Sequence, residues 1–140
     1  MKKYWITLFF VILCATTFMS CAGTGDWTYK LPNEYEVWRM NANEILVKYV
    51  GEEIGVVGIP SFVKEFAFNE QYVFTRNISH ITENDICKEE YYILDTKERK
   101  LYDHIMDFDE MKELADVLGT TVPQKWYRTS PDPNIYTNNK

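Results

Sequence analysis

The sequence predicts an α+β fold, an antiparallel β-meander of about five to seven strands with one C-terminal amphipathic helix packed on it. Short runs of β-branched and aromatic residues, separated by turn-forming residues, recur over residues 35–103. Two of these runs, YYILD (91–95) and KLYD (100–103), flank the turn-like sequence TKER and are the clearest hairpin signal. One segment with helical periodicity follows the last run. The 140 residues are the usual size of a single domain.

The earlier runs are predicted as strands because their apolar residues alternate or are β-branched. A break at residues 41–43 indicates a hairpin between the runs at 35–40 and 44–50. A break at residues 69–71 indicates a second hairpin between the runs at 62–68 and 72–76. The glycines of the third run indicate a bulge or a close approach of the backbone. The runs are residues 35–40, 44–50, 54–59, 62–68 and 72–76.

The second half of the chain begins with a polar, irregular stretch at residues 77–90, which we predict to be a long connection. After the hairpin, a helix is predicted to begin at Asp107, which has Glu110 three residues on, as in a capping box. Apolar residues then recur at helical spacing as far as Gly119. They are Phe108, Met111, Leu114, Ala115 and Leu118.

The N-terminus has the organisation of an export signal. Two lysines precede an uninterrupted apolar stretch at residues 4–15, which is long enough for a signal peptide and short of a membrane span. Small residues flank Cys21, and the segment is similar to the lipobox cut by lipoprotein signal peptidase, with Phe18 where Leu is usual. We predict that residues 1–20 are removed and that lipid is attached to Cys21.

Two other outcomes of this signal stay open. Ordinary signal peptidase cutting after Ala22 would release a secreted protein, and an uncleaved segment at residues 4–19 would be a thin membrane anchor. All three place the domain outside, and the preferred one places it on the extracytoplasmic face of the cell membrane. It divides the chain into a signal peptide (1–20), a lipidated tether (21–28), a single domain (29–122) and a flexible C-terminal tail (123–140) rich in Pro, Asn and Thr.

Charge and cysteine content exclude two classes. The formal net charge is −6, and the basic residues are scattered among carboxylates without a stripe that could neutralise phosphates, so we predict no nucleic acid binding. With Cys14 removed and Cys21 acylated, Cys87 would be the one remaining thiol, which excludes an intramolecular disulfide. Cys87 has no histidine near it in the sequence and is expected to be a half-buried small residue rather than a nucleophile.

The densest polar cluster lies beside the predicted helix start, where His104 is accompanied by Asp103, Asp107, Asp109 and Glu110. Carboxylates and an imidazole are ligands that a divalent cation can use, and a metal-dependent hydrolase could be built on them. Their spacing matches neither an EF-hand loop nor HExxH. A helix cap at Asp107 and favourable charges in the first turn explain the same residues, so we predict no metal and no cofactor.

A Ser-His-Asp triad has the residue types it needs but no supporting motif. His80 or His104 would have to combine with Ser61 or Ser79, yet the nucleophile-elbow sequence G-x-S-x-G does not occur. The glycines at 51, 55 and 58 do not have the spacing of a phosphate-binding loop. No catalytic residue is therefore predicted.

Three short segments carry a resemblance to a known family. DWxYxLPNxY (26–35), IP (59–60) and YYILDT (91–96), behind a lipobox, resemble a family of small lipoproteins of Gram-positive bacteria that is known only as a domain of unknown function. The resemblance spans most of residues 21–119. It implies a single domain outside the membrane, and its motifs are turns and strands that carry no catalytic residue.

Three functional hypotheses follow. The leading one is a membrane-anchored, non-enzymatic module that binds an envelope protein or peptide, with the membrane itself held through the N-terminal lipid. The alternative is a metal-dependent or other hydrolase that uses His104 and the neighbouring aspartates. A third is a structural partner whose acidic face covers a basic protein, as the net charge suggests.

Overall fold

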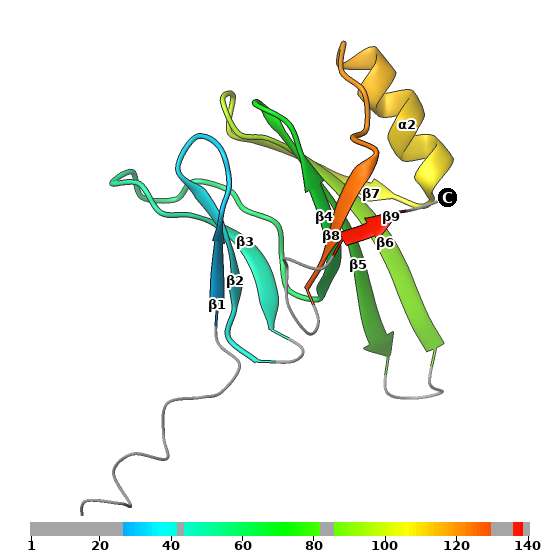
Figure 1. Ribbon diagram of the computed structural model, residues 1–140, viewed down its shortest axis with the longest axis horizontal. Helices are drawn as coiled ribbons and strands as arrows, with labels where there is room; N and C mark the ends of the chain where they lie inside the picture. Colours follow the sequence, from blue (N-terminus) through cyan, green and yellow to red (C-terminus); the bar gives the residue numbers. More distant parts are fainter. Residues whose placement is uncertain (1–26, 42–43, 82–85, 130–135, 139–140) are drawn as a thin grey trace, which may run out of the picture.

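The computed structural model describes residues 27–41, 44–81, 86–129 and 136–138. Within these ranges the chain forms nine β-strands in two antiparallel sheets and one α-helix, which confirms the predicted α+β class with more strands than expected. Figure 1 shows a three-stranded sheet on one side of a six-stranded sheet and the helix on the other side. The predicted signal peptide and Cys21 lie outside the described residues.

The smaller sheet has the order β1-β2-β3 and opens with a tight hairpin. Asn33 and Glu34 have φ angles of 57° and 64°, the backbone conformation that type I′ hairpin turns require at both central residues. Its strands are β1 (Trp27–Lys30), β2 (Tyr35–Arg39) and β3 (Ile45–Tyr49). The second and third match predicted strands.

β1 corrects the predicted boundary of the domain. The tether was expected to extend through Thr28, but Trp27 and Thr28 pair with Arg39 and Trp38 of β2. The reason is that Trp27 and Tyr29 pack against the core between the two sheets, which gives this short segment an apolar face to bury.

The larger sheet has the order β7-β6-β5-β4-β8-β9, so four consecutive strands form a meander and the last two are added beside β4. The meander and its hairpin turns at residues 69–71 and 96–99 agree with the sequence prediction. The strands are β4 (Val63–Phe68), β5 (Tyr72–Ile81), β6 (Ile86–Asp95), β7 (Lys100–Ile105), β8 (Lys125–Arg128) and β9 (Tyr136–Asn138).

Two segments before β8 differ from prediction. Residues 54–59 are a loop rather than a strand, joined to β3 by a single bridge between Val47 and Ile59. The expected long connection at residues 77–90 instead extends β5 and β6, whose register continues from Asn77 opposite Glu90 to Ile81 opposite Ile86. Polar residues dominate this end of the hairpin, so the sequence shows no clear hydrophobic alternation there.

The predicted flexible tail is also partly wrong. Residues 125–128 form β8, in which Trp126 is 2% exposed. Thr129, the residue that follows β8, is fully buried. The Thr129 hydroxyl donates a hydrogen bond to the Val63 carbonyl at 2.8 Å, and its amide donates to the Lys64 carbonyl at 3.0 Å. Burial of an indole and these hydrogen bonds outweigh the turn-forming composition of the tail.

The core has two layers, one on each face of the larger sheet. Between the sheets lie buried side chains that include Tyr35, Val47, Phe66 and Leu94. On the opposite face, α2 (Phe108–Val117) packs through Met111 and Ala115 against side chains that include Phe74, Ile93 and Trp126. Full burial of each large apolar side chain contributes roughly 1.5–3 kcal/mol.

The predicted cap at Asp107 is confirmed, but the return hydrogen bond of Glu110 goes to Met106, one residue before the N-cap position, rather than to Asp107 as in a capping box. The Asp107 carboxylate accepts a hydrogen bond from the Glu110 amide at 2.8 Å, and the Glu110 carboxylate accepts one from the Met106 amide at 2.7 Å. These contacts satisfy two backbone donors at the helix N-terminus and fix where α2 starts over the sheet.

Candidate functional site

The predicted metal candidates at the helix start lie on the surface and do not converge. His104 and Asp103 are exposed near the end of β7, with 3.7 Å between the imidazole Nε2 and the carboxylate Oδ2. Asp107 caps the helix, and Asp109 forms an ion pair with Lys112 at 2.6 Å. In the described part of the chain, no group of three or more His, Cys, Asp or Glu residues is arranged to hold a metal ion.

The other candidate nucleophiles and histidine lie along the β5–β6 hairpin and the loop before β4. Ser79 and His80 are on β5, and Cys87 is opposite His80 on β6. Ser61 lies in the loop that leads into β4. Cys87 is exposed, contrary to the expected half-buried position, because this end of the hairpin extends beyond the packed core.

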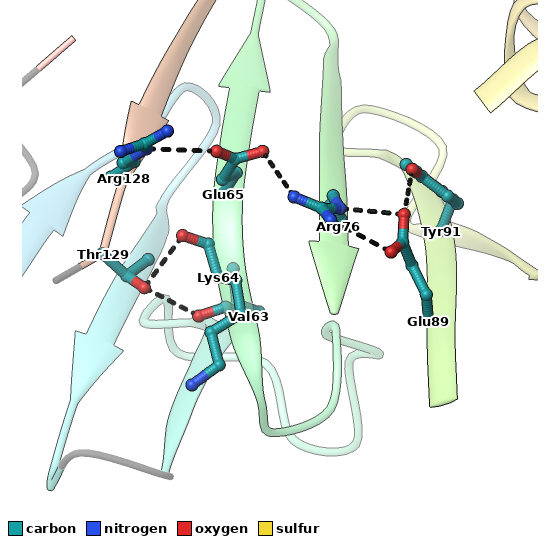
Figure 2. A network of polar contacts seen from close by, with 8 residues as sticks. All are labelled: Val63, Lys64, Glu65, Arg76, Glu89, Tyr91, Arg128 and Thr129. Carbon is teal, nitrogen blue, oxygen red and sulfur yellow. Dashed lines mark hydrogen bonds and ion pairs between the residues drawn. The ribbon is translucent and has the colours of Figure 1, made fainter. Parts of the chain in front are cut away.

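A row of charged side chains across four strands is the most organised polar feature that the structure describes. The row consists of Arg128 on β8, Glu65 on β4, Arg76 on β5 and Glu89 on β6, and the hydroxyl of Tyr91 completes it. Figure 2 shows these side chains as one continuous chain of contacts across the strands. We call this set the charged row.

The geometry of the charged row centres on Arg76. Its Nε and Nη2 donate to the two carboxylate oxygens of Glu89 at 2.9 and 3.0 Å, a bidentate pairing. Its Nη1 donates to Glu65 at 3.3 Å, and Arg128 donates to the other oxygen of Glu65, also at 3.3 Å. The Tyr91 hydroxyl donates to Glu89. Both carboxylates are thus neutralised by neighbouring guanidinium groups.

A shallow pocket of about 360 Å³ lies over the charged row. Trp126, Phe108 and Tyr91 give it aromatic walls, and Phe108 belongs to the first turn of α2, so the helix cap positions one wall. The Glu65 side chain is 9% exposed, whereas Glu89 is 40% and Arg128 is 58% exposed. The pocket therefore has a buried centre and accessible ends.

The contacts of the charged row shift the pKa values of Glu89, Tyr91 and Arg76 away from neutral pH. The hydrogen bonds from Arg76 and then from Tyr91 lower the pKa of Glu89 below its ordinary value. Burial and the hydrogen bond to Glu89 raise the pKa of Tyr91 to about 12, and the hydrogen bond to Glu89 raises the pKa of Arg76. Glu89 therefore stays ionised and Tyr91 stays protonated at neutral pH.

General acid–base catalysis needs groups whose pKa values lie near the working pH, because such groups donate and accept protons efficiently. The shifts in the charged row move the pKa values the other way. What the charged row offers is fixed recognition: alternating positive and negative groups beside aromatic side chains. It also joins four strands through side-chain contacts. The arrangement suits binding or strand bracing better than proton transfer.

Sequence reasoning missed the charged row, although a weak signal for it exists. Glu65 lies two residues before Ala67, so strand alternation places the two side chains on one face, and Ala67 is buried on the face that α2 covers. A carboxylate at such a position is rarely buried without a charged partner. That rule predicts an arginine or lysine beside Glu65, but it does not say which one.

Comparison with known proteins identifies a family and no function. A family model described as "Protein of unknown function (DUF3997)" matches residues 32–121. No curated protein and no solved structure was found to match the chain. Among the residues that the structure describes, no helix has the length and hydropathy to cross a membrane.

Proposed function

The chain belongs to the DUF3997 family, whose model covers more than half of it, and we propose that this member is a lipid-anchored, non-enzymatic binding module on the extracytoplasmic face of the cell membrane. The anchor is lipid on Cys21, and the folded domain begins a few residues later at Trp27. Its partner is an envelope protein or peptide.

The observation that carries the non-enzymatic part is the state of the charged row. Every carboxylate in it has a guanidinium partner within 3.3 Å. The pKa of Glu89 is lowered and that of Tyr91 is raised, so neither group is poised to exchange a proton near neutral pH. The aspartates near His104 are engaged at the helix start or splayed on the surface, which removes the geometry that a hydrolase would need.

The test of the anchor is fractionation of cells that express the full chain, with Cys21→Ala compared against Cys87→Ala. The two variants remove one thiol each, and Cys87 is exposed on the folded domain, far along the chain from the tether. We expect Cys21→Ala to move the protein from the membrane fraction to the medium or soluble fraction. Cys87→Ala should stay with the membrane.

The binding role is tested in the same cells by a membrane-impermeant crosslinker. We expect the wild-type chain to enter a discrete higher-mass complex, and we expect a lower yield of this complex when Cys21→Ala releases the chain. Retention of Cys21→Ala in the membrane fraction would contradict the anchor. A wild-type chain that stays monomeric at every crosslinker concentration would contradict the binding role.

A further inference from the structure

The side chain of Ile54, in the loop between β3 and β4, is fully exposed to solvent. Ile54 is 101% exposed relative to an extended reference, and Val50 and Val57 on the same loop are each 42% exposed. The loop joins β3 to β4, and we call residues 50–59 the distal loop. Single exposed apolar residues are common on protein surfaces, so the conformation of the loop around Ile54 decides whether this one has a role.

The distal loop is held at both ends by hydrogen bonds. The Val50 amide donates to the Glu34 carbonyl at 2.8 Å, and the Tyr35 hydroxyl donates to the Val57 carbonyl at 3.1 Å. Val47 and Ile59 exchange two backbone hydrogen bonds, at 3.0 and 3.1 Å. The Ile54 tip therefore projects from a fixed base.

Glycines make this conformation accessible. A Cβ atom on Gly58 would lie 2.2 Å from the carbonyl oxygen of Val47, so only glycine lets the loop approach β3 this closely. Gly55, next to Ile54, has a φ of 81°, in the left-handed region. The sequence thus specifies a backbone that presents Ile54 rather than burying it.

The charges around the tip come from Glu52 and Glu53, with Lys48 and Arg99 close by. Glu53 forms an ion pair with Arg99, whose guanidinium also lies 4.9 Å from the centroid of the Tyr49 ring. Glu52 is exposed and has no ion-pair partner in the ranges that the structure covers. The whole chain has a formal net charge of −6. A surface that meets this loop gains from positive charge at its rim.

The distal loop lies at the end of the smaller sheet opposite the start of the domain. Trp27 pairs with Arg39, and Arg39 pairs with Ile45, so these residues share one end of the sheet. Tyr35 pairs with Tyr49 at the other end, where the loop begins. Figure 1 shows the loop, in teal, at the upper end of the smaller sheet.

We propose that the distal loop is a docking site for a protein partner that receives Ile54 in an apolar socket rimmed by lysine or arginine. This inference rests on the proposed binding role and adds its site and the chemistry of its partner. A preformed loop binds without a large ordering cost, and an apolar anchor contributes to binding when a pocket of the partner desolvates it fully. A hollow of about 820 Å³ behind the loop, lined by residues that include Leu46, Tyr49, Val56 and Leu101, accepts a side chain from the partner.

A lipid surface fits this site less well. Glu52 and Glu53 precede Ile54 in the sequence, and carboxylates are repelled by anionic headgroups. The loop also lies at the end of the smaller sheet opposite the start of β1. A membrane and a second copy of this chain are therefore outcomes that the test must separate from the proposed partner.

The test is photocrosslinking in living cells with the full chain, using a photoreactive amino acid in place of Val57. The site reports on the distal loop and leaves Ile54 free for substitution. Ile54→Asp is compared with Val117→Asp, because Val117 on α2 is likewise an aliphatic residue that is 82% exposed. Neither change disturbs buried packing, and equal denaturation midpoints confirm that both variants fold.

We expect one crosslinked protein whose labelled peptide is apolar and adjacent to lysine or arginine. Its yield should fall about tenfold or more with Ile54→Asp, fall with Glu52→Lys, and stay unchanged with Val117→Asp. Crosslinks to lipid, to a second copy of this chain or to nothing would overturn the inference. So would a yield that Ile54→Asp leaves unchanged.

Failure here is distinguishable from failure of the proposed function. A chain that stays in the membrane fraction and is captured in a complex by the impermeant crosslinker, but gives no crosslink from position 57, would keep the binding role and place the site elsewhere. A chain that is neither anchored nor captured would remove both.

Discussion

Replacing Arg76 with methionine tests whether the charged row stabilises the fold. Arg76→Met keeps the length of the side chain and removes three hydrogen bonds, two to Glu89 at 2.9 and 3.0 Å and one to Glu65 at 3.3 Å. It leaves the Glu65 carboxylate, 9% exposed, with Arg128 alone at 3.3 Å. Breaking a fully buried ion pair costs roughly 3–5 kcal/mol and an exposed one at most about 1 kcal/mol.

The charged row lies between these limits, because its centre is buried and the Arg76 side chain is 33% exposed. We therefore expect the free energy of unfolding to fall by about 2 kcal/mol in urea titrations at neutral pH. The matched control is Lys112→Met, which breaks the exposed ion pair to Asp109 and should cost less than about 0.5 kcal/mol. Equal stabilities of Arg76→Met and Lys112→Met would refute the reasoning.

Three further predictions use the same urea assay. Asp107→Ala removes the helix cap and should cost about 1 kcal/mol. Gly58→Ala places a methyl group against the Val47 carbonyl and should cost more than about 2 kcal/mol, since backbone must move. Glu89→Gln should destabilise the protein at neutral pH and lose this effect in acid. The pKa of Glu89 is lowered on folding, so its contribution is present above the ordinary value of 4.5 and is lost as pH falls through the folded value.

Each of these has a contrary result. A wild-type midpoint for Asp107→Ala would mean that the Asp107 cap does not hold the helix start. Unchanged stability of Gly58→Ala would show that the distal loop does not lie against β3. A deficit in Glu89→Gln that is the same at neutral pH and at a pH well below the folded pKa of Glu89 would show that the charge of Glu89 is not what stabilises the row.

The sequence predicts the local features of this fold well. The helix start at Asp107 and the turn at residues 96–99 depend on neighbours within a few residues, and both are where they were expected. Trp126 shows the limit of that reasoning. Its neighbours Pro123 and the polar tail indicate a mobile end, but its indole is buried against the sheet and α2, a contact that no local pattern encodes.

The charged row illustrates the same limit for the site. Glu65, Arg76, Glu89 and Arg128 come from four strands, and their contacts depend on strand order and register. The order β5-β4-β8 places a C-terminal strand beside β4, which the predicted meander did not contain. The acidic cluster near His104 is conspicuous in the sequence, but its members do not converge, because Asp107 caps the helix and Asp109 pairs with Lys112.

Intact-mass analysis of the full-length protein extracted from its own membranes tests the central claim most directly. The account predicts a mature chain that begins at Cys21 and has the added mass of lipid on that residue. An unlipidated chain beginning near Gly23, or one that begins at Met1, would contradict it.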